Sequence, residues 1–198
     1  MLKPARIVLW TAALAAVAGF AAAWIIGRGL PDAGRLPLAA QIGGPFELTA
    51  QDGSRFASTK LAGRPFALFF GFTQCPDICP TTLLELSNHL KTLGDAGARL
   101  AVVFVSVDPE RDRPADLKAY LANFDARIVG LTGTAAEIAD IAKAYRAVYE
   151  KVPTSGGYTL NHTASVYLMD ARGRFAGTLS YQESPAVQIE KLRRLLAQ

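Results

Sequence analysis

Two cysteines are the residues in this chain whose type and spacing best suit chemistry. Cys75 and Cys79 are separated by three residues in the segment Cys-Pro-Asp-Ile-Cys-Pro. We expect this segment to connect a buried strand to the start of a helix, where backbone N–H groups and the helix dipole stabilise a thiolate. A four-residue offset can place both sulfurs on one side of the first helical turn, where they could share a metal ion or form a disulfide.

A structural role for the pair is the simpler alternative, either as two small buried hydrophobic residues or as a disulfide that only braces the loop. Two cysteines in 198 residues are too few for a disulfide-rich scaffold, and a chain of this length can bury a core without them. Three intervening residues, rather than two, also differ from the usual thioredoxin redox motif. These observations favour a chemical use, and metal binding over disulfide exchange.

The two histidines of the chain differ in their sequence setting. His162 follows a polar loop expected over Val152–Asn161, whereas His89 lies on a predicted helix but off its stripe of leucines. We expect His89 to be a solvated surface residue. For His162 alone, a histidine satisfied in the domain interior is the simpler interpretation, unless the fold places it beside the cysteines.

Two thiolates and one imidazole would form a soft set of three ligands suited to Cu(I), and an added oxygen or nitrogen ligand could hold Cu(II). Structural zinc normally needs four protein ligands. Asp77, which we expect to be an exposed carboxylate near the metal, or a remote carboxylate could supply the fourth. Zinc therefore stays an alternative at this stage.

Apolar runs define the elements that must position these residues. The run Pro65–Phe72 is short, aromatic and ends at the cysteines, as expected for a strand covered on both faces. Leucines at positions 83, 86, 90 and 93 then recur at helical spacing until Gly94. Leu100–Val107 is predicted to be a second buried strand.

The rest of the soluble part alternates strands and helices in the same way. Strands alternating with helices, followed by a terminal hairpin and helix, imply an α/β fold with a mixed sheet and helices on both faces. We expect a hairpin of Phe46–Thr49 and Ser54–Ala57, a helix over Pro114–Phe124, a strand over Ile128–Leu131, a helix over Ala135–Tyr149 with Thr134 as N-cap, a hairpin of Ala164–Met169 and Arg174–Leu179, and a final helix over Pro185–Leu196 with Ser184 as N-cap.

An uncharged apolar run lies near the N-terminus. Ile7–Ile26 spans 20 residues, with Lys3 and Arg6 before it and Arg28 after it. The run is long enough to cross a bilayer, and the basic residues before it favour a cytoplasmic N-terminus. A signal peptide cleaved near Ala21–Ala23 is the alternative, and it would export the domain as well.

We therefore divide the chain into a single-pass membrane anchor or uncleaved signal at residues 1–28, a linker at residues 29–40 and a domain at residues 41–198. In a Gram-negative bacterium this arrangement places the domain in the periplasm, on the inner membrane. The net charge of +4 comes from Lys and Arg residues interleaved with Asp and Glu. That distribution does not indicate a nucleic-acid-binding surface.

Three sequence blocks are more specific than composition or spacing. They are FGFTQCPDICP at Phe70–Pro80, VDPERD at Val107–Asp112 and NHTASVYLMD at Asn161–Asp170. In their order, spacing and joint occurrence they resemble the Sco/SenC family of copper-binding assembly factors for cytochrome c oxidase. The resemblance covers about Gln41–Gln198.

The resemblance implies a thioredoxin-like domain with an N-terminal hairpin, carried on a membrane anchor, in which Cys75, Cys79 and His162 coordinate copper. It also implies that the loop before the last hairpin packs against the cysteine loop. The implied partners are the copper-binding subunit of cytochrome c oxidase, which would receive the copper, and other copper chaperones. In some members of the family the cysteines also perform dithiol chemistry on that subunit.

Several neighbouring residues carry open questions. Gln74 stands where the family often has a histidine or serine, and Asn161 where it often has an aspartate. These two differences from the family leave the metal affinity and the reduction potential of the site open, because groups next to the ligands influence both properties. Asp108 could cap the following turn, or it could serve in partner docking or redox tuning. Phe72 and Tyr158 could shield the site or belong to the core.

The function favoured by these observations is a copper metallochaperone. The alternative is a periplasmic thiol–disulfide oxidoreductase, in which Cys75 attacks a partner disulfide and Cys79 resolves the mixed disulfide. A peroxidase of the peroxiredoxin type fits the layout, but closely paired cysteines are less expected in it.

Overall fold

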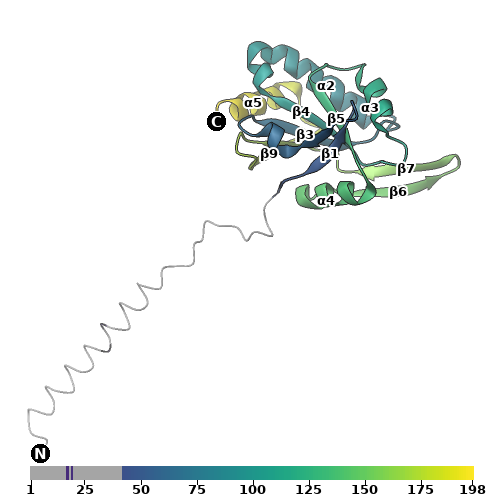
Figure 1. The fold of residues 1–198 in the computed structure, drawn as a ribbon. Helices are drawn as coiled ribbons and strands as arrows, with labels where there is room; N and C mark the ends of the chain where they lie inside the picture. Colours follow the sequence, from purple (N-terminus) through teal and green to yellow (C-terminus); the bar gives the residue numbers. More distant parts are fainter. Residues whose placement is uncertain (1–16, 18, 20–41) are drawn as a thin grey trace, which may run out of the picture. The chain divides into compact units, whose positions relative to one another are not determined.

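The computed structural model describes residues 17, 19 and 42–198 of the chain (Figure 1). Residues 42–198 form one compact unit. The predicted membrane-spanning segment, residues 7–26, lies outside the described residues apart from 17 and 19, and the predicted linker, residues 29–40, lies outside them entirely. No helix among the described residues is both long and apolar enough to cross a membrane.

A mixed sheet of seven strands forms the centre of this unit. Its strands are β1 (Glu47–Ala50), β2 (Arg55–Ala57), β3 (Phe66–Gly71), β4 (Ala101–Ser106), β5 (Ile128–Thr132), β8 (Val166–Met169) and β9 (Phe175–Leu179), in the order β2-β1-β5-β4-β3-β8-β9. The strands β3, β4 and β5 are parallel, whereas β8 runs antiparallel to β3 and β1 antiparallel to β5. Every residue of β3 is buried, as expected for a strand covered on both faces.

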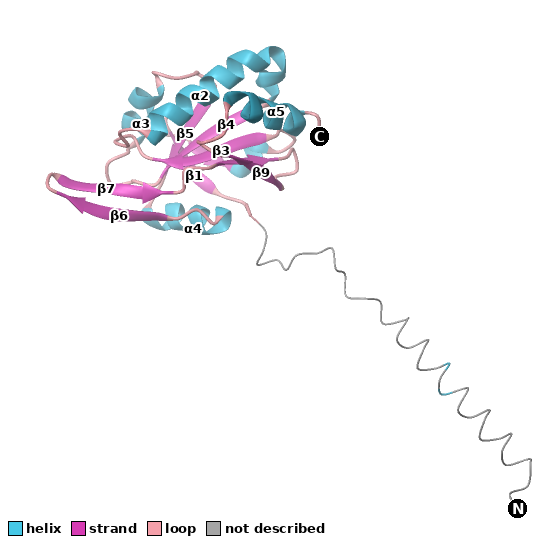
Figure 2. Ribbon diagram, turned by 180° about the vertical axis from the view of Figure 1, so that it is seen from behind, coloured by secondary structure: helices cyan, strands magenta, loops and turns pink. Residues whose placement is uncertain are grey.

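Four α-helices cover the two faces of the sheet. The helices are α2 (Ile78–Leu93), α3 (Pro114–Leu121), α4 (Ala135–Tyr145) and α5 (Pro185–Leu196), with short 3-10 turns η2 (Ser58–Leu61) and η3 (Gly94–Arg99). The helices α2, α3 and α5 lie on one face and α4 lies on the other (Figures 1 and 2). Because β3, β4 and β5 follow one another in a single direction across the sheet, right-handed connections place α2 and α3 on the same face.

The core follows from the alternation of side chains along β3. Phe70 faces α4, where its ring centroid lies 6.0 Å from that of Tyr145. Phe69 points to the opposite face and lies 6.0 Å from the ring of Phe104. Adjacent residues of one strand therefore support both helical layers. The predicted mixed α/β architecture with helices on both faces is confirmed, and it is thioredoxin-like.

The region before His162 differs from its prediction. The helix predicted to reach Tyr149 ends at Tyr145, where Arg146 takes a left-handed φ of 55°. The predicted loop Val152–Asn161 is a hairpin, formed by β6 (Tyr149–Thr154) and β7 (Gly157–His162). Most of its residues are exposed or half-buried, so it lacks the alternation of apolar and polar residues by which strands are recognised.

The hairpin β6–β7 is a two-stranded sheet of its own and projects from the rest of the domain (Figures 1 and 2). His162, the last residue of β7, is paired with Tyr149, the first residue of β6. The histidine therefore lies at the base of the hairpin, where the hairpin meets the domain.

The N-caps of α4 and α5 provide a test of local stability. Thr134 Oγ1 accepts a hydrogen bond of 3.2 Å from Glu137 N, and Glu137 Oε2 accepts one of 2.7 Å from Thr134 N. We expect Thr134→Ala to lower the free energy of unfolding by about 1 kcal/mol, because it leaves an N–H group of the first turn without its partner. Chemical denaturation monitored by circular dichroism measures this change.

Ser184→Ala is the matched control for Thr134→Ala. The side chain of Ser184 precedes α5 but makes no capping hydrogen bond. We expect a smaller loss of stability from this substitution, and equal losses in the two variants would contradict the assigned role of Thr134.

Candidate metal centre

The cysteine loop connects the buried strand β3 to the helix α2. Cys75 lies in the loop and Cys79 in the first turn of the helix, and both are free thiols. Cys79 is fully buried, whereas Cys75 has an exposed fraction of 9%. The loop is tied down by a hydrogen bond of 3.2 Å from Cys75 N to Phe72 O. The two sulfurs therefore differ in their access to solvent although they belong to one short segment.

The last residue of β3 makes room for the inner sulfur. A Cβ atom added at Gly71 would lie 2.7 Å from Cys79 Sγ and 2.7 Å from Phe104 Cε2. Both contacts are too close for a real side chain. A glycine within a strand is a recognised sign of such close approach, so the sequence held a signal for this position that the prediction did not use.

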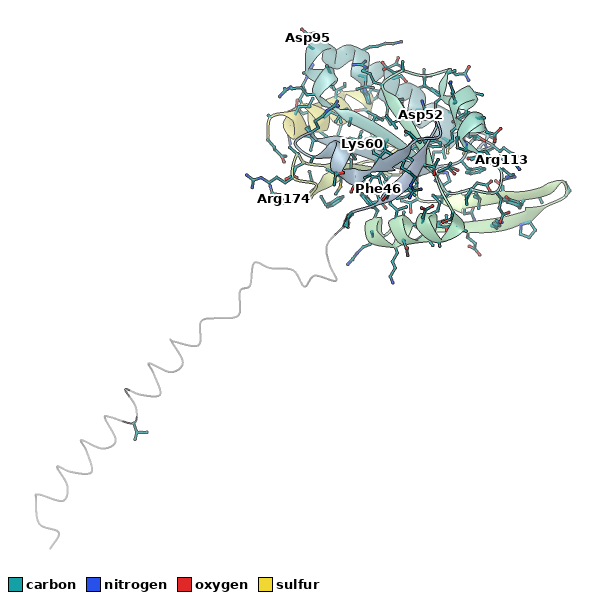
Figure 3. The ribbon with its side chains drawn as sticks, viewed as in Figure 1. Phe46, Asp52, Lys60, Asp95, Arg113 and Arg174 are labelled. Atoms are coloured by element: carbon teal, nitrogen blue, oxygen red, sulfur yellow. The ribbon has the colours of Figure 1, made fainter. Side chains whose placement is uncertain are left out.

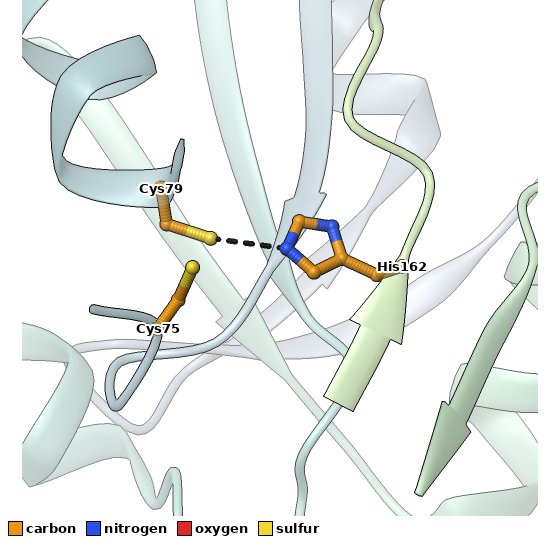
Figure 4. A group of neighbouring side chains, drawn as sticks. All are labelled: Cys75, Cys79 and His162. Atoms are coloured by element: carbon orange, nitrogen blue, oxygen red, sulfur yellow. Dashed lines mark hydrogen bonds between the residues drawn. The ribbon is translucent and has the colours of Figure 1, made fainter. Parts of the chain in front are cut away.

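His162 reaches the cysteines from the base of the hairpin (Figure 4). Its Nε2 lies 3.3 Å from Cys79 Sγ, and its Nδ1 lies 3.1 Å from the carbonyl oxygen of Thr163. Because a carbonyl oxygen only accepts hydrogen bonds, Nδ1 carries the proton of the neutral ring and the lone pair of Nε2 faces the sulfurs. The rings of Phe69 and Phe72 lie 6.1 and 5.8 Å from the imidazole and enclose it edge to face.

The structure thus brings together all three predicted site residues. One ligand atom from each of Cys75, Cys79 and His162 lies within 4.8 Å of the others. Within residues 17, 19 and 42–198, no other group of three or more His, Cys, Asp or Glu side chains has the spacing of a metal site. Asp77 is exposed, as predicted, but does not belong to this group. Two thiolates and one imidazole fit a soft cation such as Cu(I), whereas the fourth ligand that structural zinc needs is missing from this group.

The pKa values of the two thiols are shifted in opposite directions. A hydrogen bond from the Cys79 thiol lowers the pKa of Cys75 to about 3, against the opposing effect of burial. The same hydrogen bond, together with burial, raises the pKa of Cys79. Cys75 is therefore a thiolate at neutral pH, whereas Cys79 stays protonated. Cys79 loses its proton only when a bound cation or disulfide formation takes the place of that hydrogen bond.

A buried carboxylate braces the cysteine loop. Asp112 is fully buried, and its two oxygens accept hydrogen bonds from Thr73 N at 2.9 Å, Thr73 Oγ1 at 2.6 Å and Ser106 Oγ at 2.6 Å. Burial raises the pKa of this carboxyl, against the lowering effect of these donors. Sequence reasoning gave Asp112 no role, because nothing in the spacing shows that its side chain points back to the cysteine loop.

Asp108 does not act as a side-chain cap. Its backbone carbonyl accepts a hydrogen bond of 2.9 Å from Asp112 N, which closes the turn. Its buried carboxylate instead pairs with Arg111 and accepts a hydrogen bond of 2.8 Å from the hydroxyl of Tyr158. Tyr158 is half-buried and contacts this carboxylate, whereas Phe72 encloses the His162 ring.

The prediction that His89 is a solvated surface residue is wrong. His89 has an exposed fraction of 4%, and its Nε2 lies 2.6 Å from Oε1 of Gln188 on α5. The leucines of α2 face the sheet, but α5 covers a second side of the same helix. A position off the leucine stripe is therefore buried as well, which a single amphipathic pattern does not reveal.

The close contact at Gly71 predicts the effect of adding a methyl group. We expect Gly71→Ala to lower the free energy of unfolding by about 1–3 kcal/mol, because Cys79 and Phe104 must move. Gly156→Ala is the matched control, since nothing lies within 4 Å of the Cβ position at Gly156. Denaturant unfolding of both variants measures the difference, and a neutral Gly71→Ala would show that the packing around Cys79 is looser than described.

The unequal thiols predict a pH dependence. In the reduced, metal-free chain, the ultraviolet absorbance of one thiolate should persist below neutral pH and disappear only as the pH approaches about 3. Because this pKa is lower in the folded state, ionisation of Cys75 stabilises the fold above the ordinary cysteine value, and the stabilisation is lost as pH falls through the folded value. Cys75→Ser should abolish the signal. Titration of that absorbance near the ordinary value for cysteine would contradict the hydrogen bond from Cys79.

Comparison with known proteins assigns the chain to a family. The model of the SCO1/SenC family matches residues 35–197. An SCO2-like protein of Rickettsia conorii is 38% identical over 156 residues, which cover 77% of this chain and 76% of that protein. The residues that the family model matches include the cysteine loop and the hairpin that carries His162.

Solved structures show the same relationship. The structure of ScoI of Bradyrhizobium japonicum with copper bound is 46% identical, with a TM-score of 0.73, and the match covers 78% of this chain and 99% of that chain. The structure of yeast Sco1 with copper bound is 36% identical, with a TM-score of 0.73, and the match covers 79% of this chain and 89% of that chain. Since the family model spans most of the sequence and the fold agrees over the described domain, the chain belongs to the SCO1/SenC family.

Proposed function

We propose that this chain binds copper through the sulfurs of Cys75 and Cys79 and Nε2 of His162, and delivers it to the copper-binding subunit of cytochrome c oxidase. The observation that carries the proposal is the convergence of these three donor atoms within 4.8 Å. The similar structures of ScoI from Bradyrhizobium japonicum and yeast Sco1, both solved with copper bound, support the choice of metal.

The geometry suggests the order in which the donors act on the copper cargo. The thiolate of Cys75 is the more exposed sulfur and meets the cation first. Cys79 then loses its proton, because a bound cation replaces that proton in stabilising two adjacent sulfurs. The lone pair of His162 Nε2 already faces the sulfurs and completes a three-donor set for Cu(I). A further oxygen or nitrogen ligand would adapt the site to Cu(II).

Delivery follows the reverse order. A ligand from the partner would exchange first with Cys75 at the edge of the site, so copper passes between proteins without entering solvent. We infer that residues 1–28 anchor the chain in the bacterial inner membrane and hold the domain in the periplasm. Such a tether would keep the domain near the oxidase subunit and raise its local concentration. Other copper chaperones would supply the copper.

A thiol–disulfide oxidoreductase is the second candidate. The opposite pKa shifts of Cys75 and Cys79 favour it. A thiolate at Cys75 would attack a partner disulfide, releasing one partner thiolate, and Cys79 would then displace the second and close the Cys75–Cys79 disulfide. The partner gains the two electrons that the dithiol loses. His162 has no necessary part in this exchange.

Copper titration tests the first candidate. We expect the reduced full-length chain, solubilised in detergent, to bind one Cu(I) tightly in competition with a chromogenic chelator. Cys75→Ser, Cys79→Ser and His162→Ala each remove a donor and should weaken binding by more than the about 10- to 100-fold typical of losing an outer partner of a ligand. His89→Gln removes the other histidine of the chain and should leave the affinity unchanged.

Two outcomes would decide against copper binding. One is a wild-type chain that does not bind a single copper tightly, and the other is indifference of binding to all three substitutions. Disulfide exchange by the metal-free chain that survives His162→Ala would favour the oxidoreductase.

A further inference from the structure

The main sheet brings the two segments that carry the site residues to one edge, because β3 pairs antiparallel with β8, but it does not pair these segments with each other. Cys75 and Cys79 belong to the loop and helix after β3, whereas His162 ends a hairpin that forms a sheet of its own. Backbone pairing holds β7 to β6 but does not hold either strand against the cysteine loop. The pairing of β3 with β8 brings the imidazole near the sulfurs, and side-chain contacts between the two segments complete its placement.

The guanidinium group of Arg111 contacts both segments. Its Nη1 donates a hydrogen bond of 3.1 Å to Oε1 of Gln74, next to Cys75, and one of 2.9 Å to the carbonyl oxygen of Tyr158 on β7. One nitrogen atom thus connects the cysteine loop to the strand that ends at His162. A loop between β4 and α3 supplies it, so the connection comes from a third segment of the chain.

Aromatic rings of the same two segments flank the cation. The Cζ atom of Arg111 lies 3.8 Å from the ring centroid of Tyr158 and 5.9 Å from that of Phe72. Phe72 in turn lies 5.8 Å from the ring of His162. The contacts therefore run from the guanidinium through Phe72 to the imidazole, and they include stacking that a lysine ammonium could not reproduce.

Buried hydrogen bonds fix the orientation of Arg111. Its Nε donates to the carboxylate of Asp108, whose side chain is fully buried. The other oxygen of that carboxylate accepts a hydrogen bond of 2.8 Å from the hydroxyl of Tyr158. Asp108, Arg111 and Tyr158 thus form a closed set of contacts in which each side chain touches the other two. On the outer side of Tyr158, Lys151 lies 4.5 Å from the ring and pairs with Glu110.

We propose that Arg111 is a positioning residue of the site, which sets the place of the His162 ring relative to the cysteine sulfurs by linking the cysteine loop to β7. Arg111 touches neither sulfur nor imidazole, and acts through Phe72, Gln74 and Tyr158. The placement of the ring does not depend on a metal. Its consequence for copper binding rests on the function proposed above.

The metal-free chain allows a direct test of ring placement. The sequence has two histidines, so nuclear magnetic resonance should show two imidazole environments. The ring currents of Phe69 and Phe72 should displace the signals of His162 from their ordinary positions. We expect Arg111→Met, and also Arg111→Lys, to shift these signals towards those of a free imidazole. The signals of His89, buried between α2 and α5, should stay unchanged and report an intact fold.

Two further variants make the test specific. Arg113→Met is the matched control, because Arg113 is an exposed arginine two residues away at the periphery of the domain (Figure 3). It should leave both histidines unaffected. Tyr158→Leu removes the ring on which the guanidinium stacks and should shift His162 in the same direction as Arg111→Met. Unchanged His162 signals in Arg111→Met and Tyr158→Leu would overturn the proposal, whether or not the chain binds copper.

A double-mutant cycle tests the consequence for copper. We expect Arg111→Met to weaken Cu(I) binding by about 10- to 100-fold, as found for outer partners of metal ligands. The same substitution in a His162→Ala background should have little further effect, because its influence passes through the imidazole. An equal loss in both backgrounds would show that Arg111 acts on the cysteines or on overall stability instead. Failure of the wild-type chain to bind copper would refute the proposed function, while the magnetic resonance result would still decide the role of Arg111.

Discussion

The close approach of a sulfur and an imidazole nitrogen from distant parts of the chain is the constraint on which the site depends. Cys79 Sγ and His162 Nε2 lie 3.3 Å apart although 83 residues separate them in sequence. The approach requires an inner sulfur packed against a strand without a side chain at Gly71, and a hairpin whose base lies beside the cysteine loop. Buried carboxylates on the segment after β4 hold the neighbouring parts, Asp112 on the cysteine side and Asp108 on the hairpin side.

Burial and hydrogen bonding prepare these donors before any metal arrives. The Cys75 sulfur is already ionised, and the Cys79 thiol keeps its proton and donates a hydrogen bond to it. The carbonyl oxygen of Thr163 accepts a hydrogen bond from Nδ1 of His162, which leaves the lone pair of Nε2 facing the sulfurs. Little reorganisation is then needed for a soft cation to bind. The same arrangement suits a dithiol that attacks a disulfide, so electrostatics at the cysteines alone does not separate the two functions. The histidine adds a nitrogen donor that copper coordination uses and that disulfide exchange does not require.

The sequence predicted the parts of the fold that have a strong local pattern. Pro65–Phe72 and Leu100–Val107 are dense apolar runs, and they form the buried strands β3 and β4. The type and spacing of Cys75 and Cys79 indicate a reactive pair, but the three sequence blocks were needed to join them with His162 in one site, since no periodicity shows that a hairpin folds back onto a loop. The hairpin itself was missed because its strands bury few side chains. His89 was misplaced because α2 has a second covered side, and the roles of Gly71 and Arg111 are visible only in three dimensions.

The separation of the hairpin from the main sheet has a consequence for how such a site could arise. The sheet, its helices and both cysteines form a complete dithiol domain, to which the hairpin adds one imidazole and the side chains that hold it. Repositioning of this hairpin would move the nitrogen donor without changing the strand pairing of the main sheet. The nitrogen donor and the sulfur donors therefore belong to separate structural elements. A domain with a reactive dithiol therefore needs only an added hairpin, and no new core, to gain the nitrogen ligand of a metal site.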